Sequence, residues 1–144
     1  MRVLATIVLS MALLGLAPGQ ATAQEGAEPV FGSYTEMRGT LDELMSKRQI
    51  ADLLTAFGGA DEMSLQDMTG LETQVRNIFP VDFENSAVML RDEMENGFNQ
   101  ELIAYWTGPA YIYARLLWHE RPGGEVISIK MVFNSDPDVL IPLF

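Results

Sequence analysis

The spacing of apolar residues changes near Asn85, and this change limits the folds open to the chain. Between Ser33 and Pro80 apolar residues recur at helical spacing, whereas after Asn85 they alternate in segments separated by turn sequences. Helices followed by an antiparallel meander are typical of a segregated α+β domain. We therefore predict two or three N-terminal helices packed on one face of a four-stranded, cone-like curved sheet.

Local signals place the helices. Ser33 begins the first helix, with Glu36 three residues later in a capping-box pattern. The apolar stripe changes phase near Ser46, so one straight helix cannot direct both halves at a single core and a break is predicted there. A Gly-Gly pair ends the second segment. Ser64 begins a further helix, which Pro80 ends.

Turn sequences divide the second half into four predicted strands. The Asn96-Gly97 pair predicts a tight hairpin, and Pro122-Gly123-Gly124 predicts a second connecting loop. The predicted strands are residues 87–94, 98–106, 110–120 and 126–134.

Alternation predicts two unlike sheet faces. The inner face, which receives the helices, is predicted to carry Ile112, Ala114, Leu116, Trp118, Ile127, Ile129, Met131 and Phe133. The outer face is predicted to carry Tyr111, Tyr113, Arg115, Leu117, His119, Val126, Ser128, Lys130 and Val132. This outer face is unusually apolar and aromatic for a surface in contact with water.

The element order over residues 33–134 resembles the nuclear transport factor two-like, or cystatin-like, α+β cone superfamily. The stretch from Ala110 to Asn134, with two long strands around a Pro-Gly-Gly loop, resembles it most. The resemblance implies a pocket between sheet and helices, and dimers that meet through the outer sheet face. No catalytic motif of the superfamily's enzymes matches this chain, so no catalytic residue is transferred.

The first 23 residues have the pattern of a secretory signal peptide. Arg2 precedes an apolar run from Val3 to Leu16, and Ala21-Thr22-Ala23 matches a cleavage site. The apolar run is short for a bilayer span, which makes an uncleaved anchor the weaker alternative. We predict cleavage after Ala23, a flexible leader at residues 24–32 and one domain at 33–144, exported to the periplasm or secreted.

Charge and composition limit the kinds of partner and chemistry that are expected for this chain. The chain has a net charge of −11, which becomes −12 when Arg2 leaves with the signal peptide. Such a surface repels nucleic acid and anionic lipid, so neither is expected as a partner, and no lasting membrane anchor is expected after cleavage. The chain has no cysteine, so it has no disulfide or thiolate chemistry.

Few residues are candidates for catalysis or metal binding. His119, the single histidine, is the candidate general base, although a place at the sheet surface is the simpler interpretation. Asp136 and Asp138 fit a turn or a helix cap better than a calcium loop. No metal site or cofactor is predicted.

The remaining candidates are aromatic or cationic. The candidate ligand-binding residues are Trp106, Tyr111, Tyr113, Arg115 and Trp118. Arg115 and Lys130 could bind an anion, or pair with Glu101 or with a partner chain; the structural or interface role is favoured.

Two functions follow from these patterns, and the sequence leaves open whether the chain is an enzyme. The first is a non-catalytic binding or protein-interaction module, with a homodimer through the outer sheet face or an apolar small molecule as partner. The alternative is a small isomerase, cyclase or hydrolase that uses His119 or a buried carboxylate as general base. A third possibility concerns the outer face alone: the C-terminal segment 139–144 folds back and covers it.

Overall fold

The computed structural model describes residues 28–144, so the predicted signal peptide and leader residues 24–27 lie outside the described part. Three α-helices precede a meander of four long strands, as the sequence predicted. The helices are α1 (Tyr34–Ser46), α2 (Ile50–Ala56) and α3 (Leu65–Ile78), with the 3-10 turn η3 (Gly59–Asp61) between the last two. The long strands are β2 (Asn85–Glu93), β3 (Phe98–Thr107), β4 (Ala110–Glu120) and β5 (Val126–Asn134).

The predicted count of four strands is wrong, because a short strand β1 (Val30–Phe31) precedes α1. It pairs antiparallel with β5, so the sheet has five strands in the order β1-β5-β4-β3-β2. The side chain of Phe31 is buried, and the amide of Ser128 donates to the carbonyl of Pro29 at 2.9 Å. Residues 29–31 are therefore held to the sheet edge by pairing and burial, although the sequence placed them in a flexible leader.

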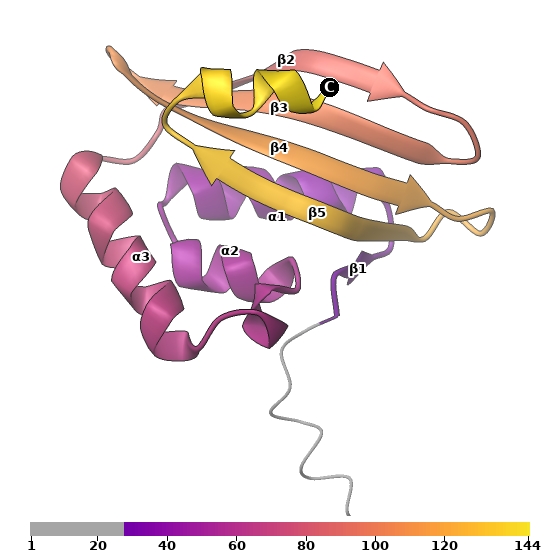
Figure 1. Ribbon diagram of the computed structural model, residues 1–144, viewed down its shortest axis with the longest axis horizontal. Coiled ribbons are helices and arrows are strands. Elements are labelled where there is room, and N and C mark those ends of the chain that lie inside the picture. Colours follow the sequence, from indigo (N-terminus) through magenta and orange to yellow (C-terminus); the bar gives the residue numbers. More distant parts are fainter. Residues whose placement is uncertain (1–27) are drawn as a thin grey trace, which may run out of the picture.

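Helical structure is also not confined to the N-terminal half. Two 3-10 turns, η4 (Pro137–Val139) and η5 (Ile141–Leu143), follow β5 and lie across the outer face of the sheet (Figure 1). The three α-helices cover the opposite, inner face. The sheet is thus enclosed between a helical layer and a short C-terminal segment.

Local chemistry explains the helix boundaries. The Ser33 and Ser64 hydroxyls accept from the amides of Glu36 and Asp67, each at 3.1 Å, which confirms both predicted starts. The break near Ser46 is also confirmed: α1 ends there, and Arg48 adopts a left-handed conformation with φ of 55° before α2 begins. Each helix can therefore direct its own apolar stripe at the common core.

The core lies between the helices and the inner sheet face. Its fully buried members include Met37, Leu41 and Met45 of α1 and Leu116 of β4, and Trp118 is 1% exposed. The inner positions of β4 are the four that alternation predicted. Packed side chains therefore occupy the space between helices and sheet.

A bulge corrects the predicted faces of β5. Ser128 pairs with Trp118 and Lys130 pairs with Leu117, so Ile129 is an extra residue between two consecutive pairs. The extra residue moves the β5 residues on its N-terminal side to the face opposite the one that simple alternation predicts. Val126 and Ser128, which were predicted to lie outside, are therefore buried on the inner side, whereas Ile129 is 48% exposed.

Candidate functional site

The interior holds a network of charged and hydroxyl side chains between α1 and β3. Glu101 is fully buried on the inner face, opposite Leu116. Its carboxylate accepts from the Tyr34 hydroxyl at 2.6 Å and from Arg38 Nη1 at 2.8 Å, and Arg91 Nη1 lies 3.3 Å from it. Three donors therefore compensate the one buried negative charge.

A second carboxylate extends this network along α1. Asp42 accepts from Arg38 Nη2 at 3.2 Å and from the Tyr105 hydroxyl at 2.6 Å. Burial and the bond to Asp42 raise the pKa of Tyr105 far above its ordinary value, and burial with the bond to Glu101 raises the pKa of Tyr34. Both phenols therefore stay protonated as donors at neutral pH, and the network fixes α1 on the sheet.

Glu101 was a predicted alternative partner of Arg115 and Lys130, and this pairing is wrong. Glu101 lies on the inner face, whereas Arg115 lies on the outer face. The signal was present in the alternation, because Glu101 shares the face of Ile103 and Tyr105 on β3. A charged residue at such a core position requires partners. The sequence pattern does not identify Arg38, on a helix distant in sequence, as one of them.

The outer face brings together four of the predicted ligand-binding residues. The rings of Trp106, Tyr111 and Tyr113 form a row, with centroids 5.7 and 6.3 Å apart and planes within 15° of parallel. Arg115 follows on the same face and donates to Gln100 Oε1 at 2.8 Å. Trp118 is separate: it is buried on the inner face against Tyr34, at 5.2 Å between ring centroids.

The C-terminal segment covers part of this outer face, as the sequence allowed. Arg115 Nη2 donates to the Leu143 carbonyl at 3.4 Å, and its guanidinium lies 5.7 Å from the centre of the Phe144 ring. Leu140 is buried, and so are Leu102 and Ala104, although both belong to the outer face of β3. These three residues lie outside the main core, and we refer to them as the outer cluster. Figure 1 shows the C-terminal segment crossing the face of the sheet to which Leu102 and Ala104 belong.

Deletion of residues 139–144 should expose that cluster. Because Leu102 and Ala104 would then meet water, we expect the shortened domain to stay folded but to bind a hydrophobic dye strongly and to associate. Dye fluorescence and light scattering measure both effects. The control is deletion of Phe144 alone, which leaves Leu140 in place. Equal dye binding by the full domain and the shortened domain would contradict this expectation.

His119 lies outside the core on the outer face. Its Nε2 is 2.9 Å from the carbonyl oxygen of Asn96 in the β2–β3 turn, and its ring stacks on Phe98 at 4.1 Å. Phe98 and His119 are a directly opposed pair of β3 and β4. Within the described residues, no carboxylate hydrogen-bonds to the ring. The contacts present hold the hairpin turn against β4.

Asp136, the first of the two aspartates after β5, caps the turn that follows it. The amide of Asp138 donates to Asp136 Oδ1 at 2.9 Å at the start of η4, as predicted for a turn. Among residues 28–144, no group of three or more carboxylate or histidine side chains is arranged to hold a metal ion. In the same range, no helix is both long enough and apolar enough to cross a membrane.

Comparison of the chain with protein-family models, curated proteins and solved structures found no match. The α+β architecture therefore defines the class of protein.

Proposed function

We propose that the mature chain is an exported, non-catalytic interaction module whose contact surface is the outer face of the sheet. The observation that carries this proposal is the gathering of accessible apolar side chains there. We call this surface the outer-face patch; it comprises Leu90, Trp106, Tyr111, Tyr113, Ile141, Leu143 and Phe144. Tyr111 in the aromatic row is 42% exposed, and Ile141 and Leu143 in the segment that crosses the same face are 41% and 49% exposed.

Side chains, and not the free backbone edge, provide the contact. Strand β2 is paired on one side only, but a bulge at Met89 interrupts its ladder. Its second half carries Arg91, Asp92 and Glu93 in succession. A bulge and charges are devices that keep an edge strand from pairing with another chain. An aromatic row beside a patch of aliphatic residues is instead typical of the centre of a protein interface.

The enzyme alternative has less support from the geometry. A general base needs a free lone pair in a pocket that admits a substrate. The Glu101 carboxylate is engaged by Tyr34, Arg38 and Arg91. His119 donates from Nε2 to a backbone carbonyl and keeps the lone pair of Nδ1, but the surface hollow that it lines is open, and no carboxylate of the described residues orients the ring. The apolar ligand implied by the cone resemblance has less support for a related reason, since packed side chains fill the space where it would bind.

The partner we propose first is a second copy of the chain, because a twofold axis brings one apolar patch against itself. The mature protein is expected to be a dimer at micromolar concentration in light scattering. Substitution of Tyr111→Ser together with Leu143→Ser should give a monomer with little change in stability, because neither side chain belongs to the buried core. The matched control is Leu65→Ser at the start of α3, since Leu65 is 70% exposed and belongs to no strand.

A monomeric wild-type protein would reject the homodimer. A photo-crosslinking residue at position 111, compared with one at position 65 in the native host, then tests for a different protein partner. If neither experiment gives a contact specific to position 111, the interaction module is rejected. N-terminal analysis of the same native protein should find Gln24 first, and a retained Met1 would reject export.

A further inference from the structure

A second surface site lies at the edge of the sheet formed by β1 and β5, where the η3 turn approaches β5. A groove of about 190 Å³ lies there, with apolar walls from Leu54, Phe57, Met63 and Met131. This volume is below the range of pockets for drug-sized molecules. The groove therefore suits a ligand with few non-hydrogen atoms.

Two glycines and a proline build the groove. Gly58 has φ of 88°, and a Cβ there would lie 3.2 Å from Pro29 Cγ. A Cβ on Gly59 would lie 2.9 Å from the Leu54 carbonyl oxygen. Pro29 is itself fixed by the hydrogen bond from the Ser128 amide. The η3 turn is thus brought close to β1 and β5 by residues that tolerate no larger side chain.

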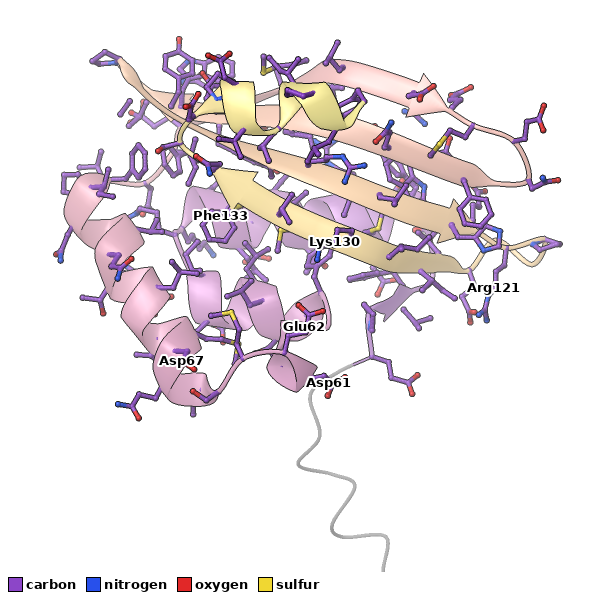
Figure 2. All side chains as sticks on the ribbon, viewed as in Figure 1. Asp61, Glu62, Asp67, Arg121, Lys130 and Phe133 are labelled. Carbon is purple, nitrogen blue, oxygen red and sulfur yellow. The ribbon has the colours of Figure 1, made fainter. Side chains whose placement is uncertain are left out.

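Opposite charges face one another across this groove. Figure 2 shows Lys130 extending from β5 toward the η3 turn, and Glu62 extending from that turn toward the strand. Both side chains line the groove, and neither forms an ion pair with any residue in the range 28–144. The groove thus has a cationic group on one wall and an anionic group on the other.

Ser128 adds an unsatisfied polar group. It lines the groove from β5 and is 4% exposed, and its Oγ has no hydrogen-bond partner among the described residues. A buried hydroxyl without a partner is costly unless something else satisfies it. The Oγ is closed off from solvent, so the groove offers a ligand its two charges and its apolar walls.

We infer that this groove binds a small zwitterion, namely a free α-amino acid with an apolar side chain. The ligand carboxylate pairs with Lys130, its ammonium pairs with Glu62, and its side chain contacts the apolar wall. The inference is independent of the outer-face patch, because the groove shares no residue with it.

L-leucine is the probe, with N-acetyl-leucine and leucinamide as matched ligands that each lack one charge. In NMR titrations of the mature protein, leucine should shift the amides of residues 58–63 and 128–131, with a Kd of about 1 mM or tighter. Each matched ligand should bind at least about tenfold more weakly, because one wall then loses its ion pair. Lys130→Gln and Glu62→Gln should each weaken leucine binding by a similar factor.

The control variants are Lys47→Gln and Glu43→Gln, which remove an exposed pair on α1 and should leave binding unchanged. Saturable shifts confined to the groove and reduced by both groove variants support the inference. It is overturned if leucine causes no shifts there, if the three ligands bind equally, or if only Lys130→Gln matters, which would indicate a simple anion site. Circular dichroism verifies that each variant is folded, and none of the four replaced side chains is buried in the core.

Discussion

Replacement of Glu101 by alanine is expected to destabilise the domain by about 3 kcal/mol, because it removes the fully buried carboxylate that pairs with both Arg38 and Arg91. Asp42 then remains as the one acidic partner of Arg38. The Arg38 side chain is only 14% exposed and Glu101 is fully buried, so water cannot replace the lost partner well. The Tyr34 hydroxyl loses its acceptor in the same variant. Urea unfolding followed by tryptophan fluorescence measures the change, since Trp118 lies against Tyr34.

Two further variants separate the buried charge from the loss of packing. Glu93→Ala removes the other acidic neighbour of Arg91, but Glu93 is 73% exposed, so a change within about 0.5 kcal/mol is expected. The double variant Arg38→Met with Glu101→Leu removes both charges and keeps most of the volume, and it should recover much of the lost stability. A loss for Glu101→Ala no larger than that for Glu93→Ala would show that the network does not stabilise the fold.

Substitution of Gly97→Ala is expected to cost about 3 kcal/mol, from backbone strain and a steric collision together. Gly97 has φ of 83° in the β2–β3 turn, and a Cβ there would collide with the carbonyl oxygen of Glu120. Because the Gly97 and Glu120 backbones lie this close together, the amide of Glu120 donates to the Gly97 carbonyl at 2.8 Å. The hairpin and the end of β4 therefore cannot both keep their places when a side chain is added.

Two glycines serve as controls for this effect. Gly108 has φ of 52° with no atom near a built Cβ, so Gly108→Ala should show the strain alone, about 1 kcal/mol. Gly123 has neither a neighbour nor a positive φ, so Gly123→Ala should be close to neutral. Thermal unfolding measured by circular dichroism should rank the three variants in this order. A Gly97→Ala protein as stable as Gly123→Ala would contradict the collision.

Local signals were sufficient for most element boundaries. Ser33 and Ser64 cap helices through bonds that span three residues, and Asn96 and Gly97 both have positive φ in the tight hairpin turn. The predicted bounds of the strands Ala110–Glu120 and Val126–Asn134 agree with the structure. Such features depend on near neighbours in the chain, so the sequence contains the information directly.

Contacts between distant segments could not be predicted in this way. The bulge at Ile129 reverses the faces of Val126 and Ser128, and it is visible only in the pairing with β4. Strand β1 is two residues long and exists only because β5 offers an edge. The same holds for the candidate sites. The aromatic row of the outer face could be predicted from alternation along β4, whereas the groove between Lys130 and Glu62 could not.

The sequence by itself determined the α+β class, the helix caps, the hairpin turn and the two faces of β4. Each of these features follows from patterns among residues that are close together in the sequence. Only the tertiary structure decided three other features: the partners of Glu101, the place of the C-terminal segment over Leu102, and the meeting of the η3 turn with β5. Each of these joins segments far apart in sequence, and their meeting depends on how all the layers pack together.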